Sequence, residues 1–248
     1  MTDQRPPRGF FGRRHGHRLR AGRQALIDDL LPGLAVDVNP AVSLDPATLF
    51  PPEAFRPIVH PPEAFRPEVW LEIGFGGGEH LAALAQANPD VGFIGCERFI
   101  NGIASLLSHI QAADIGNIRI ADADAQDLLN ALTPASIDRL FLLFPDPWPK
   151  TRHHKRRFVN QGNLDNMARV LTDGAQVRFA SDHSEYCDWT LERFLDHKDF
   201  TWVAEHPDDW RVRPDDWPQT RYEATALAKA LDISYFTFQR VVRAITAR

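Results

Sequence analysis

The segment from residue 140 to residue 157 holds the side chains best suited to chemistry. Leu140 to Phe144 form a continuous apolar run, which is typical of a central strand covered on both faces. Three prolines then follow at alternate positions and stiffen the loop, because each fixes φ and removes a backbone donor. An acid, an aromatic ring and a cation lie among them: Asp146, Trp148 and Lys150. In open α/β sheets, ligands bind at this end of the strands.

A basic run continues this loop. Its five cations are accompanied by two histidines and by no acid; it comprises Lys150, Arg152, His153, His154, Lys155, Arg156 and Arg157. A charge run is more often a solvated surface than a ligand site. Three prolines after a buried strand favour a ligand site here, because so rigid a loop is costly unless it must hold a shape. We interpret the run as a phosphate-binding surface.

A glycine loop predicts a nucleoside-binding site. Gly74, Gly76 and Gly78 lie between a predicted strand and a predicted helix, where glycines let the backbone approach a ligand closely. The dinucleotide fingerprint requires a glycine at position 79, which is Glu79. An acid at the start of that helix also disfavours a pyrophosphate. The spacing instead fits the G-x-G-x-G loop of nucleoside-binding methyltransferases.

Three acids at the ends of successive predicted strands indicate a cationic cofactor. Glu72 could hold the ammonium group of an amino-acid tail, Glu97 could accept two ribose hydroxyls, and Asp124 could accept from an adenine amino group. Any one of them alone is more often a helix cap or a solvated charge. Together they suit S-adenosyl-L-methionine, which carries positive sulfonium and amino groups.

Two later segments allow a structural role, a ligand contact or both. Asp182 follows a predicted strand and could cap the next helix or contact a substrate. Thr220 and Glu223 have the spacing of a capping box, with Arg221 and Tyr222 between them.

Strands and helices alternate from residue 69 onward. The predicted strands span residues 69–73, 91–96, 117–121, 137–144, 175–180, 200–204 and 234–242. The predicted helices span residues 79–88, 99–113, 125–132, 159–171, 184–197 and 223–231. This alternation predicts an α/β fold with a doubly wound, mostly parallel sheet and helices on both faces.

Composition separates a flexible N-terminal extension, residues 1–67, from a folded domain, residues 68–248. The first 25 residues hold seven arginines against one aspartate and lack apolar periodicity, so we expect disorder there. Residues 26–67 are rich in proline and contain PPEAFRP twice, which indicates a local duplication in a surface linker. The net charge of −5 combined with two basic segments favours a focused site for a polyanion.

Two cysteines without a CxxC spacing argue against a disulfide framework and against a structural zinc site. No apolar run approaches the roughly 20 residues that span a bilayer, and no signal peptide is evident. We therefore expect a cytoplasmic protein that contacts no membrane and holds no metal.

Several segments together resemble the bacterial tRNA (guanine-N7-)-methyltransferase family. They are LEIGFGGG (71–78), IGCE (94–97), DADAQD (122–127), FPDPWPKTRHHKRR (144–157), ASD (180–182) and TRYE (220–223). The similarity runs from about Trp70 onward, and the FPDPW block is its specific part. It implies a Rossmann-like class I methyltransferase sheet with an antiparallel C-terminal strand. It also implies EC 2.1.1.33 activity, which makes 7-methylguanosine at position 46 in the variable loop of tRNA.

The resemblance further implies which residues bind each ligand. S-adenosylmethionine is expected at the acids Glu72, Glu97, Asp124 and Asp146, beside Gly74, Gly76 and Gly78. Contacts to the tRNA are expected at Lys150, Arg152, His154, Lys155, Arg156, Arg157, Asp182, Thr220, Arg221, Tyr222 and Glu223. Pro149 stands where some relatives carry histidine, so no catalytic role is carried over to that position.

Guanine N7 has an in-plane lone pair and no proton, so methyl transfer to it needs neither a general base nor a metal. We expect catalysis by proximity, orientation and desolvation. Asp146 is the first candidate for a carboxylate that stabilises the cationic product ring. Asp182 is a candidate to accept from the guanine N1 and amino hydrogens, and Trp148 is available for stacking.

The residues leave three alternative functions open. A methyltransferase acting on a protein or a small molecule would not need the basic run. An RNA-binding module with a vestigial pocket would not need the acids at the strand ends. An NAD-dependent enzyme is disfavoured by Glu79. The sequence does not distinguish a monomer from a homodimer.

Overall fold

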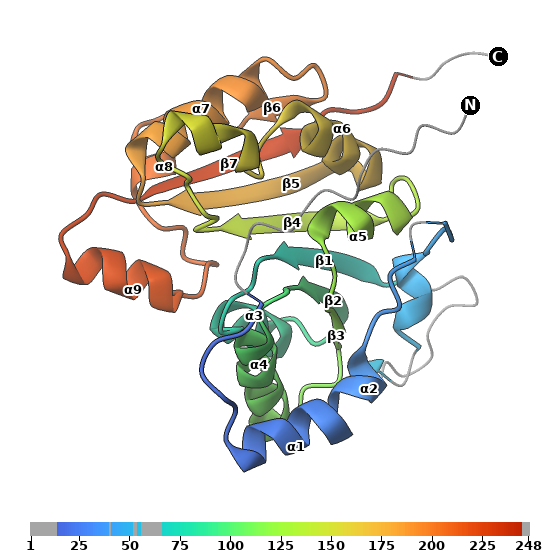
Figure 1. The fold of residues 1–248 in the computed structure, drawn as a ribbon. Coiled ribbons are helices and arrows are strands. Elements are labelled where there is room, and N and C mark those ends of the chain that lie inside the picture. The colour runs from blue at the N-terminus through green and yellow to red at the C-terminus, as the bar shows by residue number, and fades with distance from the viewer. Residues whose placement is uncertain (1–13, 40, 52–53, 56–65, 245–248) are drawn as a thin grey trace.

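A mixed sheet of seven strands forms the centre of the protein (Figure 1). The computed structural model describes residues 14–39, 41–51, 54–55 and 66–244. The strands are β1 (Glu68–Ile73), β2 (Val91–Cys96), β3 (Ile118–Ala121), β4 (Ile137–Leu143), β5 (Leu171–Ser181), β6 (Phe200–Trp202) and β7 (Ser234–Arg240). Their order is β3-β2-β1-β4-β5-β7-β6. The first five strands are parallel and β7 is antiparallel to both neighbours, which confirms the predicted fold class.

Helices cover both faces of the sheet, and the sheet separates two apolar clusters. One face is covered by α3 (Glu79–Ala87), α4 (Ile100–Ala113) and α9 (Arg221–Ala228). The other is covered by α5 (Ala125–Ala131), α6 (Gln161–Val170) and α7 (Ser184–Leu195). The short helices in the described part of the chain are α2 (Leu31–Leu34), η1 (Pro46–Leu49), η3 (Thr151–Arg156) and α8 (Asp208–Arg211). None of the helices in the described part of the chain could span a lipid bilayer.

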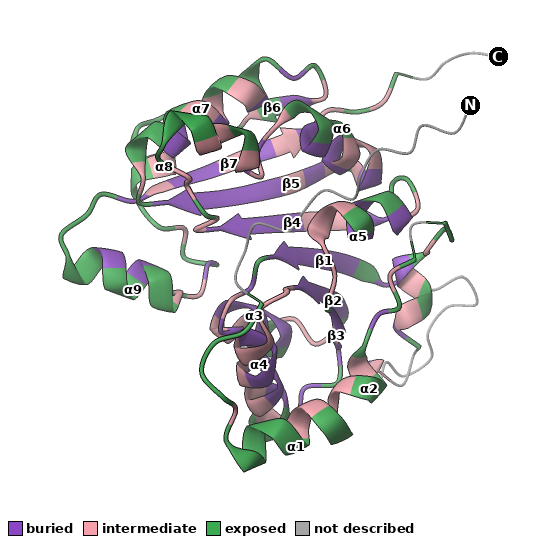
Figure 2. Ribbon diagram, in the orientation of Figure 1, coloured by how far each residue is buried: buried purple, intermediate pink, exposed green. Residues whose placement is uncertain are grey.

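The central strands are buried on both faces, as the purple ribbons in Figure 2 show. β2 is buried along its whole length, and β4 is buried from Leu140 to Leu143. These are the continuous apolar runs of the sequence, which a strand between two helical layers requires. Because the strands from β1 to β5 are parallel, their carboxyl ends meet at one edge of the sheet. The loops after them therefore lie together there.

The N-terminal region is more ordered than we expected. Residues 1–13 and most of the repeated PPEAFRP segment lie outside the described residues. α1 (Ala21–Asp29) packs on α4, and Val36 and Phe50 are buried in the core. The expectation of disorder is therefore wrong for residues 14–25. A boundary at residue 68 remains a prediction.

A short segment before α1 also contacts the start of α4. The backbone N–H of Ile100 donates to the carbonyl oxygen of Arg14, 3.0 Å away. The Asn101 side chain accepts from Gly16 and donates to His17, with distances of 2.8 and 2.7 Å. This segment therefore lies beside the loop that leaves β2.

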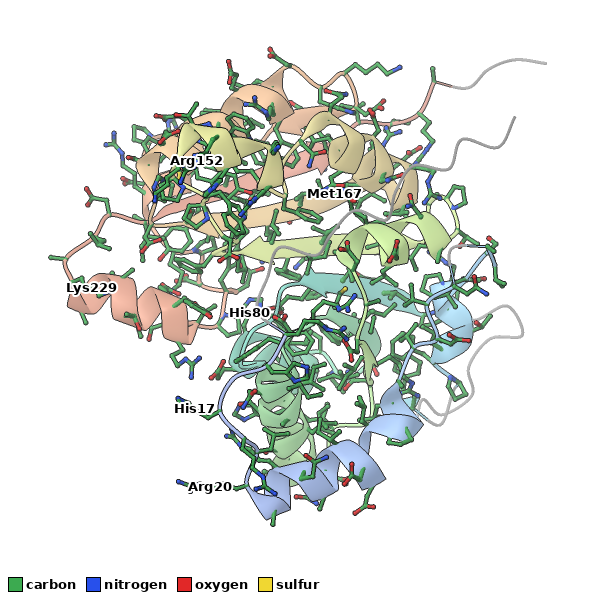
Figure 3. All side chains as sticks on the ribbon, in the orientation of Figure 1. His17, Arg20, His80, Arg152, Met167 and Lys229 are labelled. Carbon is green, nitrogen blue, oxygen red and sulfur yellow. The ribbon has the colours of Figure 1, made fainter. Side chains whose placement is uncertain are left out.

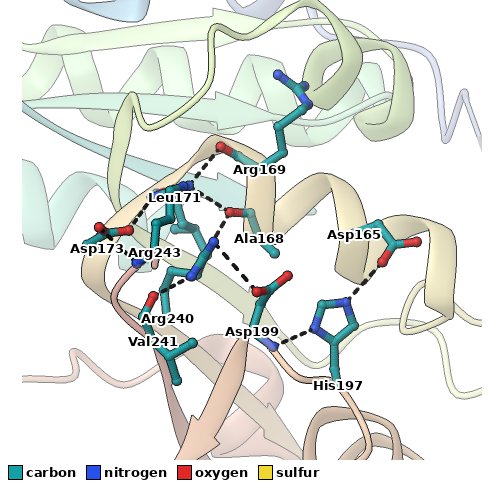
Figure 4. Close-up of polar contacts among 10 residues, drawn as sticks. All are labelled: Asp165, Ala168, Arg169, Leu171, Asp173, His197, Asp199, Arg240, Val241 and Arg243. Carbon is teal, nitrogen blue, oxygen red and sulfur yellow. Dashed lines mark hydrogen bonds and ion pairs between the residues drawn. The ribbon is translucent and has the colours of Figure 1, made fainter. Parts of the chain in front are cut away.

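Two arginines close the carboxyl end of α6 (Figure 4). Arg243 donates to the carbonyl oxygens of Ala168, Arg169 and Leu171, and Arg240 donates to Ala168. They satisfy carbonyls that a helix leaves unpaired at its end. The chain can therefore pass from α6 into β5 at Leu171 without a loop. Our prediction that the helix included Leu171 and that the strand began at residue 175 is wrong for this reason.

A substitution at Gly102 would test how closely α4 packs against the glycine loop. A methyl group at this position would collide with the backbone carbonyl oxygen of Gly76. We expect Gly102→Ala to lower the free energy of unfolding by about 1–3 kcal/mol, because the clash outweighs the gain in helix propensity. The measurement is urea denaturation followed by circular dichroism.

Gly162→Ala is the matched control, since Gly162 also lies in a helix and its nearest neighbour to an added methyl is 3.7 Å away. This variant should be as stable as the wild type or slightly more stable. Equal stability of the two variants would show that the contact between α4 and the glycine loop is not tight.

Candidate active site

A cavity opens at the carboxyl ends of β1 and β4. Its walls come from three segments that are distant in sequence: the end of β1 with the glycine loop, the end of β4, and the start of α9. Its lining includes one residue from each segment in turn: Glu72, Phe144 and Thr220. The structure thus brings together the glycine loop, the proline loop and the TRYE segment, as the sequence predicted.

Glu72 is buried in this cavity and is paired with a histidine that the sequence analysis missed. Nδ1 of His80 donates to Glu72 Oε2 over 2.8 Å. His80, labelled in Figure 3, is 2% exposed and packs edge-on against Phe141. Its Nε2 has no hydrogen-bond partner within the described residues. A lone histidine in the first turn of an apolar helix gives little signal in a sequence, because it is most often a core residue.

Glu97 ties the end of β2 to the glycine loop. Its Oε2 accepts from the backbone N–H of Gly76 at 3.0 Å, and its Oε1 accepts from Arg98 at 2.7 Å and Phe99 at 2.9 Å. Burial raises the pKa of Glu97, and the charge of Asp146 raises it further, against the lowering effect of the three N–H groups. Asp146 therefore lies near Glu97. Oε1 already accepts two N–H groups and Oε2 accepts one, so Oε2 retains acceptor capacity for a ligand hydroxyl.

Asp124 is the N-cap of α5, one of the alternatives that its sequence position allowed. Its Oδ1 accepts from the backbone N–H of Gln126 at 2.9 Å. The carboxylates of Glu97, Asp122 and Asp124 all help to raise the pKa of the buried Cys96 thiol, after burial itself. Three acids therefore surround the end of β2, and a cationic ligand would be favoured there.

The proline loop carries backbone strain. Phe144 and Trp148 have φ values of 49° and 44°, in the left-handed region that bulky residues rarely adopt. Such conformations cost about 1–3 kcal/mol each and persist only where the surroundings fix them. The backbone N–H of Phe144 is held by Ala180 on β5, at 2.7 Å. The loop presents Asp146 to solvent.

The basic run forms η3, and its cations do not all face the same way. Lys150, Arg152 and Lys155 are exposed. The guanidinium of Arg156 lies over the Trp148 ring, 4.9 Å from its centroid, and His153 packs edge-on against the same ring. Trp148 is thus part of an internal stack, rather than an open platform for a base.

Arg157 and His154 point toward α7. Arg157 is 1% exposed, and its Nε donates to the carbonyl oxygen of Pro147 at 2.8 Å. His154 Nε2 lies 3.1 Å from Glu185 Oε1. We expected Arg157 among the residues that contact RNA, and the structure buries it: the sequence shows one basic run, whereas the turn of η3 directs its last cation inward.

Asp182 does not cap α7. The N-cap is His183, whose Nδ1 accepts from the backbone N–H of Tyr186 at 3.3 Å. Because the helix begins at Ser184, Asp182 lies one residue too early for that role. Its side chain is exposed at the carboxyl end of β5.

The start of α9 has the predicted capping box. Thr220 Oγ1 accepts from the Glu223 N–H at 3.0 Å, and Glu223 Oε2 accepts from the Thr220 N–H at 3.4 Å. Glu223 is 2% exposed and is also bound by Tyr235 and Arg213. It positions the segment from inside, and its direct contact with the substrate stays a prediction.

Tyr222 lies over the glycine loop. A methyl group added to Gly76 would come within 3.2 Å of the Tyr222 ring, which also stacks on Phe144 with centroids 6.5 Å apart. Tyr222 and Arg221 are exposed next to the cavity that they line. The start of α9 therefore covers the site from the side opposite the sheet.

Comparison with known proteins agrees with this geometry. The family model Methyltransf_4 ("Putative methyltransferase") matches residues 66–234. The tRNA (guanine-N(7)-)-methyltransferase of Rhodospirillum rubrum is 46% identical over 238 residues, covering 95% of this chain and 89% of the relative. The enzyme of that name from Paramagnetospirillum magneticum is 48% identical over 236 residues, covering 94% and 93%.

The chain belongs to the tRNA (guanine-N7-)-methyltransferase family. It is an S-adenosylmethionine-dependent methyltransferase with a Rossmann-like fold. Among solved structures, the 16S rRNA methyltransferase KamB is 17% identical with a TM-score of 0.48, covering 70% of this chain and 88% of its own. An O-methyltransferase of Thermotoga maritima has 16% identity and a TM-score of 0.46, covering 73% and 62%. The fold assignment rests on the strand order and on the sequence relatives.

The residues of the cavity fit this cofactor. Glu72 supplies a buried carboxylate for an ammonium group, while Glu97 and Asp124 add acids at the next two strand ends. Gly74 has φ of 74° and open space where a side chain would project, so ligand atoms can approach its backbone. An acidic lining suits a cationic sulfonium compound and disfavours a phosphate-bearing one.

The raised pKa of Glu97 predicts how the free energy of unfolding depends on pH. An acid whose pKa is higher in the folded protein than in the unfolded chain binds its proton more tightly when folded. Its contribution to stability is therefore present at low pH and is lost as pH rises through the raised pKa. We expect the free energy of unfolding of the wild type to fall, relative to Glu97→Gln, as pH rises above the ordinary pKa of a glutamate and through the raised pKa of Glu97.

Urea denaturation of both proteins at several pH values, without added ligand, measures this difference. A difference that stays constant with pH, or one that grows in favour of the wild type, would contradict the raised pKa.

Proposed function

We propose that this chain transfers the methyl group of S-adenosylmethionine to N7 of the guanosine at position 46 in the variable loop of tRNA. The observation that carries the proposal is that the proline loop starts in the wall of the cavity at Phe144, exposes Asp146 two residues later and leads to the exposed Lys150. An acidic pocket for a cation and a basic surface for a polyanion thus meet at one rigid loop.

The pocket would hold the cofactor through its carboxylates. Glu72, oriented by His80, would bind the ammonium group. Glu97 would accept the ribose hydroxyls, and Asp124 would accept from the adenine amino group. When bound, the cofactor supplies an electrophilic methyl group on a positively charged sulfur.

Asp146 would act on the guanine that enters beside this pocket. Methylation leaves the ring positively charged, and a carboxylate fixed near the ring stabilises that charge as it develops. No side chain has to remove a proton from N7, so the contribution of the protein is orientation of the two reactants and exclusion of water. The strained loop holds Asp146 in place for this purpose.

Asp182 would select guanine over adenine. Its exposed carboxylate can accept from the N1 and amino hydrogens of guanine, whereas adenine presents an acceptor at N1. Thr220 and Tyr222, which line the cavity, would contact the same nucleotide from the α9 side.

The exposed cations of η3 would bind the tRNA backbone. Lys150, Arg152 and Lys155 face solvent next to the proline loop, where contacts to phosphates would fix the position of the tRNA. Arg156 would contribute from its place on Trp148. A tRNA substrate also leads us to expect the protein in the cytoplasm.

Methyl transfer from labelled S-adenosylmethionine to unmodified tRNA tests the proposal. We expect incorporation as 7-methylguanosine, lost when the guanosine at position 46 is replaced. Asp146→Asn should lower kcat roughly 10²-fold, because one charge-stabilising group is removed from the transition state. Asp188→Asn, an exposed acid on α7, is the control and should leave kcat unchanged.

The outcomes separate the parts of this assignment. Normal turnover by Asp146→Asn would exclude Asp146 as the stabilising carboxylate. Absence of incorporation into tRNA, with cofactor binding intact in calorimetry, would exclude tRNA as the acceptor and leave the cofactor site in place.

A second prediction concerns the binding of phosphates. Replacing Arg152 and Lys155 by alanine should raise Kd for tRNA and reduce the slope of log Kd against log salt by about 0.7–0.9 for each phosphate that is no longer neutralised. Lys198→Ala is the control, because Lys198 is an exposed cation after the far end of α7. An unchanged slope in the double variant would show that η3 is not the RNA-binding surface.

A further inference from the structure

Arg157 bonds to the loop that carries Asp146 and to the helix that begins just after Asp182, and both of these acids are proposed to act on guanine. We infer that it is a positioning residue, which holds Asp146 and Asp182 in register so that both can reach one base. This inference rests on the proposed function, because it names a residue on which the same site depends.

The first connection is to the proline loop. The Nε of Arg157 donates to the carbonyl oxygen of Pro147, the residue next to Asp146, at 2.8 Å. The three prolines of this loop have no N–H, so the loop has few donors with which to fix itself. Phe144 and Trp148 hold strained φ values on either side of this bond. A partner from outside the loop is therefore needed to stabilise its shape.

The second connection is to the first turn of α7. The Nη2 of Arg157 donates to Glu185 Oε1 at 3.1 Å, and the guanidinium lies over the rings of Tyr186 and Trp189, 5.2 and 4.7 Å from their centroids. Asp182 lies at the entrance to this helix. One planar group thus bonds to the loop after β4 and to the first turn of the helix that follows β5.

Stability alone does not account for this arginine. Its side chain is fully buried, and its Nη1 has no hydrogen-bond partner in the described part of the structure. Burying a charged donor without a partner is costly, and an apolar residue of similar size would often serve the core better. The fork of the guanidinium, however, bonds the loop and the helix from two separate nitrogens in a fixed plane, whereas a lysine offers one nitrogen on a flexible stem and an apolar side chain offers no donor.

Arg157→Lys tests the inference, because it keeps the charge and removes the fork. We expect kcat for methylation of tRNA to fall at least about tenfold, since a small displacement of Asp146 is costly for catalysis. The KM for tRNA should change less than about threefold and the salt slope should stay as in the wild type, because Arg157 neutralises no phosphate. Hydrogen exchange at the Asp146, Trp148 and Lys150 amides should become faster.

Arg193→Lys is the matched control. Arg193 also lies over the Trp189 ring, but it bonds to Glu192 and to its own helix and makes no contact with the proline loop. This variant should retain both the kcat and the exchange rates of the wild type. Glu185→Gln is a second test that leaves Arg157 in place, and it should change kcat and exchange in the same direction by less.

The readouts separate failure of this inference from failure of the proposed function. If the wild type methylates tRNA and a folded Arg157→Lys has unchanged kcat and exchange, the inference is overturned and the function stands. A lower thermal stability with exchange in the loop unchanged would also overturn it. If the wild type does not methylate tRNA, the function fails, while the exchange measurement still decides whether Arg157 fixes the loop.

Discussion

The carboxylate of Glu97 accepts three backbone N–H groups, and the cofactor half of the site depends on those bonds. One comes from Gly76 in the glycine loop and two come from the turn that starts α4. The same two segments touch again at Gly102, where only a glycine leaves room. A single side chain therefore holds together the loop after β1 and the turn after β2. These two segments form the cofactor half of the site.

Opposite charges are kept on opposite sides of the proline loop. Acids lie at the ends of β1, β2 and β3, and exposed cations lie on η3 after β4. A polyanion would be repelled by the first group and attracted by the second. A tRNA held by its phosphates on η3 could therefore present only an uncharged base to the acidic pocket. The distribution of charge, rather than the net charge, orients the two ligands relative to each other.

Much of the fold could be predicted because its strands are apolar runs that end at glycine, proline or acid. β2 begins and ends where the sequence indicated, and the capping box at Thr220 was visible from its spacing. The parts that were missed depend on tertiary contacts. Arg157 belongs to a run of cations in the sequence, and only the turn of η3 buries it. Glu223 is inaccessible because Tyr235 and Arg213, which lie elsewhere in the chain, enclose it.

The sequence also failed to predict α1 and the start of β5, again because they depend on tertiary contacts. α1 has no fully buried residue, so its packing on α4 leaves no amphipathic pattern to detect. The start of β5 was placed late because the arginines that let the chain leave α6 at Leu171 come 69 or more residues later. The N-cap of α7 is His183, whereas the sequence offered Asp182 as a candidate. The position of a helix start cannot be predicted to a single residue from the pattern of capping residues.

The antiparallel insertion of β7 has a consequence for synthesis on the ribosome. Among the described strands, β6 pairs only with β7, and the open edge of β5 is also covered by β7, although β7 is made after both. Until it emerges, the nascent chain exposes one unpaired strand edge and one strand without a neighbour, which are surfaces prone to aggregation. Tyr235 of β7 also holds Glu223 and, through it, the TRYE segment. The nascent protein would therefore gain its protected sheet edge and its completed site in the same late step.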